Sequence, residues 1–142
     1  MHAELSVLRV VTKLLVPLIL LFALYVQFHG DFGPGGGFQA GVIFAAGIIL
    51  YALVFGLDAA RRVVPPALVL RGMPLGVLLY AGTGFATVLL GGDFLDYDRI
   101  DPAHPAHGQH LGILIVELGV GLTVASTMVS LFYSFAARGA KE

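Results

Sequence analysis

One acidic residue, Glu117, lies inside the apolar stretch 111–137, and it is the side chain best placed to handle an ion. A charge inside a membrane costs about 2.5–3.5 kcal/mol even on a lenient insertion scale, so this carboxylate has to be neutral, hydrated or paired. A carboxylate can titrate, and its oxygens suit hard cations such as sodium. Three interpretations are open: a station for a proton or sodium ion, a group that holds a helix interface by hydrogen bonds, and exposure to lipid.

Two further candidates for an ion path, His29 and Asp31, precede a glycine-rich segment. This predicted turn consists of Gly33, Pro34, Gly35, Gly36, Gly37 and Phe38. Glycine lets backbones approach closely and adopt positive φ, so the segment is interpreted as a tight turn that seats the next helix against a partner. The alternatives are a part in guiding an ion, through free helix-start amides or Asp31, and a flexible linker. A phosphate-binding loop is excluded, because Phe38 and Gln39 stand where lysine and a hydroxyl residue are needed.

A third group of polar residues follows, in which three histidines lie close to Asp101. The histidines are His104, His107 and His110. Their spacing would align ligands on a helix, but Pro102 and Pro105 oppose a regular helix there, so we expect solvated loop residues or contacts to a neighbouring subunit rather than a metal site. We also expect no cofactor and no enzyme activity, since nothing combines a nucleophile, a base and an oxyanion donor.

The composition shows what must position these groups. The chain of 142 residues is 58% hydrophobic and 12% charged, with a mean hydropathy of +0.91. Apolar windows at about 10–28, 38–57, 72–92 and 111–137 are each long enough to cross a bilayer. We therefore predict an all-α, polytopic integral membrane protein with four transmembrane helices. Basic residues are too few and scattered for nucleic-acid binding, and a cleaved signal is not expected, because bulky residues follow the first apolar core.

The basic residues predict an orientation. Those on one face are Arg9, Lys13, Arg61, Arg62, Arg71, Arg138 and Lys141. Only Arg99 falls on the other face. The positive-inside rule then predicts that both termini are cytoplasmic, in a multi-pass protein of the cell membrane. Lys13 is expected to extend toward the cytoplasm rather than to pair with Glu117.

The last apolar window has three distinct faces. A small, hydroxylated stripe suited to helix packing contains Gly119, Thr123, Thr127, Ser130 and Ser134. A sector suited to lipid contains Leu111, Leu114, Ile115, Leu118, Leu122, Val129 and Phe132. Glu117 shares a third sector with Gly121, Val124 and Met128. Because this helix presents protein-contact faces on two sides, we expect partner subunits.

Glycine and proline mark the remaining contacts and ends. Gly41 follows Gly37 by four residues, and Gly76 follows Gly72 in the same way, a spacing typical of helices that touch in lipid. Prolines in segments 63–66 and 71–74 are predicted to end one helix and start the next. Residues 93–110 are predicted to form a surface loop of about eighteen residues.

Two parts of the sequence carry a family resemblance. A helix ending in Phe28-His29-Gly30, the turn from Gly33 to Phe38 and a helix continuing with Gly41 together resemble the MnhB-domain family, whose members are small subunits of Mrp-type multi-subunit sodium/proton antiporters. Residues 111–113 and 117–124 are similar to the last helix of that family. The resemblance covers nearly the whole chain and implies a single domain over residues 1–142. Asp31 and Phe32 depart from it, since more polar residues such as asparagine or serine are expected there.

The resemblance implies a function for the chain as one part of a larger machine. It implies a small membrane subunit of a complex that exports sodium in exchange for protons, driven by the proton gradient, and a secondary transporter rather than an enzyme. The implied partners include large subunits related to the antiporter subunits of respiratory complex I, which would carry the main proton relays. The matching positions are the turn from Gly33 to Phe38 and the membrane carboxylate Glu117. Two alternatives stay open: a purely structural or assembly subunit, and a subunit of a membrane-bound hydrogenase or related respiratory complex.

Overall fold

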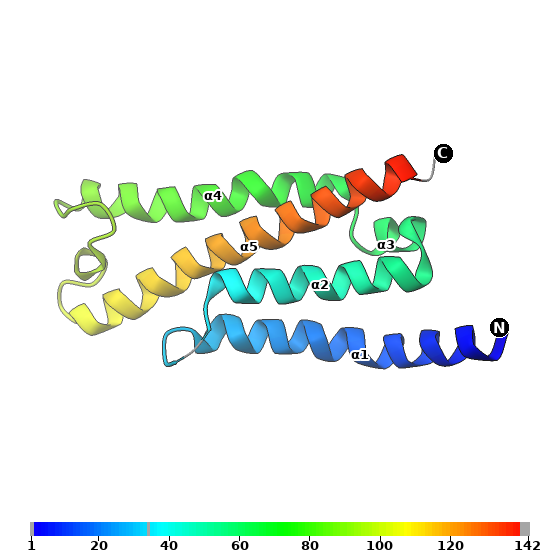
Figure 1. Ribbon diagram of the computed structural model, residues 1–142. Helices are drawn as coiled ribbons and strands as arrows, with labels where there is room; N and C mark the ends of the chain where they lie inside the picture. Colours follow the sequence, from blue (N-terminus) through cyan, green and yellow to red (C-terminus); the bar gives the residue numbers. More distant parts are fainter. Residues whose placement is uncertain (1, 34, 140–142) are drawn as a thin grey trace.

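Four long helices make up most of the molecule (Figure 1). The computed structural model describes residues 2–33 and 35–139, so Pro34 of the predicted turn and Lys141 lie outside the described residues. The long helices are α1 (His2–His29), α2 (Gly37–Phe55), α4 (Pro66–Leu89) and α5 (Pro105–Gly139). A short helix, α3 (Leu57–Val63), and a single 3-10 turn, η1 (Tyr97–Arg99), lie in the connections. All four long helices are long and apolar enough to cross a membrane, so the prediction of an all-α chain with four such helices is confirmed.

The helix ends differ from the apolar windows. Helix α1 begins at His2 rather than at residue 10, α4 at Pro66 rather than 72, and α5 at Pro105 rather than 111. Hydropathy detects the part of a helix that suits hydrocarbon, whereas a helix continues into the polar interface as long as its backbone bonds are made. Helix α2 ends at Phe55 because Gly56 has φ +95°, which breaks the helical path before α3.

Prolines mark a helix start as predicted at residues 65 and 66, but Pro74 and Pro105 differ from the prediction. Pro65 caps α4 and Pro66 occupies its first turn, where a missing amide leaves no bond unmade. Pro74 instead lies inside α4, so the prediction that it helps to start a helix is wrong. Pro105 opens α5, which is therefore helical where the sequence predicted a loop. Both corrections have one cause, because proline at a helix start is favourable and proline within a membrane helix is tolerated.

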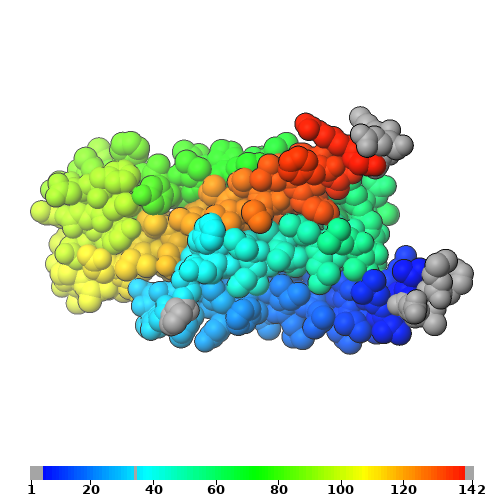
Figure 2. Space-filling model, viewed as in Figure 1, coloured from blue at the N-terminus to red at the C-terminus, as the bar shows by residue number. Residues whose placement is uncertain are grey.

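The long helices lie side by side in the order α1, α2, α5, α4, with α5 crossing at an angle (Figure 1). Seen as a filled surface, α1 lies along one edge of this row (Figure 2). The start of α1 and the end of α5 lie at the same end of the molecule, together with α3. Helix α5 contacts α2 and α4. The sequence predicts that α5 contacts protein on two sides, and partner subunits are expected for that reason. Helices α2 and α4 of the same chain provide both contacts.

The buried core lies toward the end that holds α3. Its buried members are Ala45, Ile48, Ala52, Ala60, Val69, Val129 and Tyr133. Val129 is 3% exposed there, so its assignment to a lipid-facing sector is wrong. The hydroxyl of Tyr133 donates to the carbonyl of Val64 at 3.0 Å, which ties the end of α5 to the connection between α3 and α4. The opposite end is free of this core and carries the glycine turn.

Candidate functional site

The glycine turn folds back across the end of α1. The amide of Gly36 donates to the carbonyl of Val26 at 3.2 Å, and the amide of Gly33 to that of His29 at 3.1 Å. A Cβ atom at Gly30 would lie 2.6 Å from the Cα of Gly36, and one at Gly35 would lie 2.7 Å from the Val26 carbonyl oxygen. Any larger residue at these two positions would push the turn away from α1.

Glu117 of α5 lies against this turn. A Cβ atom at Gly30 would be 3.0 Å from its Oε2, and one at Gly36 would be 3.1 Å from its Oε1. Gly36 is the N-cap of α2, so the half-buried carboxylate lies at a helix N-terminus. The unpaired amides and the dipole of a helix start favour a negative charge. The site therefore joins a carboxylate to the positive end of a helix.

The backbone of α2 approaches α5 equally closely. A Cβ atom at Gly37 would overlap the carbonyl oxygen of Glu117, and one at Gly41 would lie 2.7 Å from the carbonyl oxygen of Gly121. Val124 belongs to the same contact, because a Cβ atom at Gly41 would lie 2.9 Å from the Cβ of Val124. The face of α5 that bears Glu117 thus packs backbone to backbone on the first turns of α2.

The other two ion-path candidates make separate contacts. Asp31 pairs through Oδ2 with Nδ1 of His110, which joins the turn to the first turns of α5. Gly30, the neighbour of Asp31 in the chain, lies against the Glu117 carboxylate. His29 stacks on Tyr25, with ring centroids 5.2 Å apart. The structure therefore groups Asp31 with His110 and Glu117, while His29 packs along its own helix.

The histidines near Asp101 divide between two carboxylates. His107 lies 3.1 Å from Asp101 and His104 lies 3.8 Å from it, whereas His110 reaches Asp31. Among the side chains that the structure describes, those of residues 5–33 and 35–139, no three metal-ligating groups converge. The pairing of His110 with Asp31 was missed in the sequence, because these residues are distant along the chain and no periodicity relates them.

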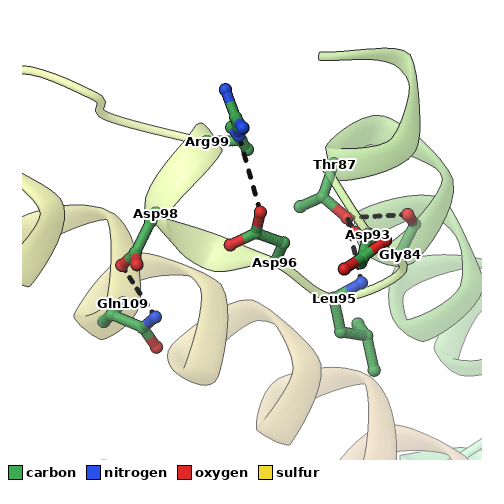
Figure 3. Close-up of polar contacts among 8 residues, drawn as sticks. All are labelled: Gly84, Thr87, Asp93, Leu95, Asp96, Asp98, Arg99 and Gln109. Carbon is green, nitrogen blue, oxygen red and sulfur yellow. Dashed lines mark hydrogen bonds and ion pairs between the residues drawn. The ribbon is translucent and has the colours of Figure 1, made fainter. Parts of the chain in front are cut away.

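The connection between α4 and α5 is ordered by hydrogen bonds (Figure 3). The Thr87 hydroxyl donates toward the carbonyls of Gly84 and Asp93, and it accepts from the Leu95 amide at 2.9 Å. Asp98 accepts from the side chain of Gln109 at 2.8 Å. Tyr97 packs over Gly112, and burial raises the pKa of its phenol. This segment is a fixed cap over the same end of the molecule as Glu117.

The small stripe of α5 faces α4. A Cβ atom at Gly119 would lie 2.7 Å from the carbonyl oxygen of Gly76, and one at Gly76 would lie 2.6 Å from that of Gly119. The hydroxyls of Thr123 and Thr127 donate to carbonyls of their own helix four residues earlier, at 2.8 and 2.7 Å. Ser130 lies further along α5 and lines a cavity between α4 and α5. The polar groups of the two threonines are thus satisfied within the helix.

Gln27 is a buried polar residue of α1 that the sequence does not mark as part of a site. Its side chain is 5% exposed, and its Nε2 has no hydrogen-bond partner among the described residues. A Cβ atom at Gly121 would lie 2.6 Å from its Oε1. In the sequence, Gln27 is a single amide side chain two residues before His29, at the end of an apolar segment. Composition alone does not distinguish a buried glutamine there from one at the membrane interface.

A comparison with known proteins bears on this arrangement. A family model described as "Domain related to MnhB subunit of Na+/H+ antiporter" matches residues 7–130. The chain belongs to the MnhB family. The MnhB resemblance noted in the sequence is thus confirmed, and the match includes the glycine turn, Glu117 and the small stripe of α5 as far as Ser130.

Relatives within the MnhB family match along most of their length. A Staphylococcus haemolyticus protein named "Putative antiporter subunit mnhB2" is 35% identical over 127 residues, which cover 88% of this chain and 89% of the relative. Proteins of the same name from Staphylococcus epidermidis and Staphylococcus aureus are 32% and 35% identical over 130 residues, covering 90% of this chain and 92% of each relative. These MnhB proteins are named as components of a transporter.

Proposed function

We propose that this chain is a membrane subunit of an Mrp-type antiporter complex that exports sodium in exchange for protons, and that Glu117 forms part of its ion path. The observation that carries the proposal is the position of the Glu117 carboxylate at the N-terminus of α2, next to the backbone of Gly36. Names of MnhB relatives as antiporter subunits support the class of complex.

The start of α2 favours a negative charge at Glu117. A carboxylate can take up or release a proton, and its oxygens can bind a cation. His110 is exposed and pairs with Asp31, so it links this site to the polar end of the molecule.

The direction of exchange and the partners belong to the same proposal. Sodium leaves the cell as protons enter, driven by the proton gradient, and large antiporter subunits related to those of respiratory complex I carry the main proton relays. The chain lies in the cell membrane with both termini cytoplasmic, as the distribution of arginine and lysine favours. The turn from Gly33 to Phe38 then lies on the outer side.

A Glu117→Gln substitution tests the ion-path role, since it keeps hydrogen bonding but removes titration. We expect sodium-dependent proton movement in proteoliposomes of the whole complex to fall by roughly 100-fold or more, the size typical of a lost proton-transfer group. Asp98→Asn is the matched control, because it neutralises an exposed carboxylate at the same end of the molecule. Normal exchange by an assembled Glu117→Gln complex would refute the ion-path role.

A structural role is the second candidate, and a separate observation favours it. Gly37 and Gly41 bring the backbone of α2 onto that of α5 at Glu117 and Gly121. If the subunit only shapes the complex, Glu117→Gln will leave exchange unchanged. Gly41→Leu, which crowds the Gly121 carbonyl, will still prevent assembly.

A further inference from the structure

A cavity at the end of the molecule that holds α3 has a different chemistry from the Glu117 site. It has a volume of about 310 Å3 and lies between α3, α4 and the last turns of α5. Its lining residues are Arg61, Pro66, Val69, Leu70, Ser130, Tyr133, Ser134 and Ala137. One charged side chain, Arg61, thus faces a cavity whose other walls are apolar or carry hydroxyls.

Arg61 has hydrogen-bonding capacity that its surroundings leave unused. Its Nε is buried and has no hydrogen-bond partner among the described residues. Its guanidinium lies over the ring of Tyr133, 5.7 Å from the centroid, which fixes the direction of the group. The Tyr133 hydroxyl is already committed to the Val64 carbonyl. A guanidinium held in this way is suited to a bidentate oxyanion such as phosphate.

The neighbouring arginine differs in each of these respects. Arg62 is exposed, and its Nε donates to the carbonyl of Asp58 at 3.3 Å. Arg62 lines the adjoining cavity near Asp58, which Arg61 also borders, but it does not line the cavity near Ser130. Arg61 and Arg62 therefore carry the same charge on the same short helix in two different environments.

The surroundings of the Arg61 cavity favour a lipid rather than a soluble anion. Leu70, which lines the cavity, is 60% exposed. Arg61 lies near the ends of α4 and α5, where an apolar span meets the polar interface. Basic pockets between membrane helices at this depth suit anionic headgroups, whose acyl chains then follow the apolar helix surface.

We propose that the cavity between α3, α4 and α5 binds the headgroup of an anionic phospholipid, with its phosphate on Arg61 and its acyl chains along Leu70. Ser130 lines the same cavity, and its hydroxyl is the further polar group offered to the headgroup. The bound lipid then holds α3 against the ends of α4 and α5.

Photo-crosslinking of the intact complex tests this site directly. The purified complex is placed in phosphatidylcholine vesicles that contain a trace of phosphatidylglycerol with a photoreactive acyl chain, and crosslinked peptides are identified by mass spectrometry. We expect crosslinks in residues 66–70 and 130–137, suppressed by excess phosphatidylglycerol but not by phosphatidylcholine. Suppression by millimolar inorganic phosphate alone would identify a free-anion site and overturn the lipid assignment.

Two variants distinguish lipid binding by the Arg61 guanidinium from lipid binding by the overall positive charge of α3. Arg61→Gln is expected to lower crosslinking about fivefold, the factor that one basic residue near an anionic surface typically contributes. Arg62→Gln, the matched control, is expected to leave crosslinking unchanged. Equal loss in both variants, or no loss in either, would overturn the proposal. If Arg61→Gln prevents assembly, competition between the two lipids in the wild-type complex decides the question.

Discussion

Hydroxyl side chains inside the long helices are satisfied mostly by backbone groups of their own helix, and Thr87 extends this pattern. Thr83 donates to the carbonyl of Leu79 four residues earlier. Thr87 is 0% exposed and also bonds the loop at Asp93 and Leu95. Leu95 has φ +65°, a conformation that costs a residue with a side chain about 1–2 kcal/mol. The Thr87 hydroxyl therefore helps to hold a strained residue of the cap.

A Thr87→Val substitution tests this role, because valine keeps the shape and removes the hydroxyl. The part-buried Leu95 amide and the Asp93 carbonyl then lose a partner, so we expect the free energy of unfolding to fall by about 1 kcal/mol. Hydrogen exchange of the purified complex would show faster exchange at the Leu95 amide. Thr83→Val, which removes a bond within one helix, should leave that amide protected. Equal protection of Leu95 in both variants would contradict the role of Thr87.

Single residues differed in how far the sequence could predict their surroundings. A lone acid in an apolar window marks Glu117 by its cost in lipid, so this candidate was visible without a structure. The partner of Asp31 was not, since its contact with His110 depends on how the turn and α5 meet. Gln27 was missed for the same reason, because its burial arises from the packing of α1 on α2 and α5.

At the scale of elements, the glycines at the two ends of α2 have similar backbone geometry and different surroundings. Gly36 has φ +122° and ψ 177°, and Gly56 has φ +95° and ψ 157°, a region that glycine alone adopts readily. A Cβ atom at Gly36 would lie 3.1 Å from Glu117, whereas one at Gly56 would meet nothing within 4 Å. A side chain at Gly56 would therefore meet backbone strain alone, whereas one at Gly36 would meet backbone strain and crowding by Glu117.

Replacing each of these glycines by leucine measures the two effects. Gly56→Leu is expected to cost about 1–3 kcal/mol through backbone strain alone, leaving a reduced amount of assembled complex. Gly36→Leu adds a side chain against Glu117 and is expected to abolish accumulation of the complex in membranes. Native gel electrophoresis of solubilised membranes measures both. Equal amounts of complex for the two variants would show that crowding at the turn is unimportant.

The elements were predictable in number and type but less so in their ends and neighbours. Four apolar windows indicated four helices because hydrocarbon thickness sets a minimum length. The short helix α3 was not apparent, since Leu57–Val63 follows α2 with a break at Gly56 alone. Pro74 and Pro105 were misread because proline is compatible both with helix starts and with membrane-helix interiors. The predicted turn overlaps the connection between α1 and α2, but its last two residues, Gly37 and Phe38, belong to α2.

For the whole molecule, the row of helices leaves extensive apolar surface uncovered on its two edge helices. Leu14, Leu18 and Leu21 of α1 are exposed, as are Leu78 and Phe85 of α4. In a membrane this surface meets lipid or other subunits. The sequence predicted partners from two-sided contact of α5, and that reasoning was wrong, because α2 and α4 provide both sides. Support for a complex comes instead from the MnhB family.

Orientation is the property of the whole molecule that is most directly testable. The chain contains no cysteine, so single cysteines can be introduced at exposed positions near each end: Asp58→Cys in α3 and Ala103→Cys before α5. If both termini are cytoplasmic, a membrane-impermeant maleimide added to intact cells should label Ala103→Cys at once and Asp58→Cys only after permeabilisation. The opposite pattern would place the glycine turn and Glu117 on the cytoplasmic side. It would also refute the orientation predicted from Arg61, Arg62 and the other basic residues, because that prediction depends on their retention in the cytoplasm.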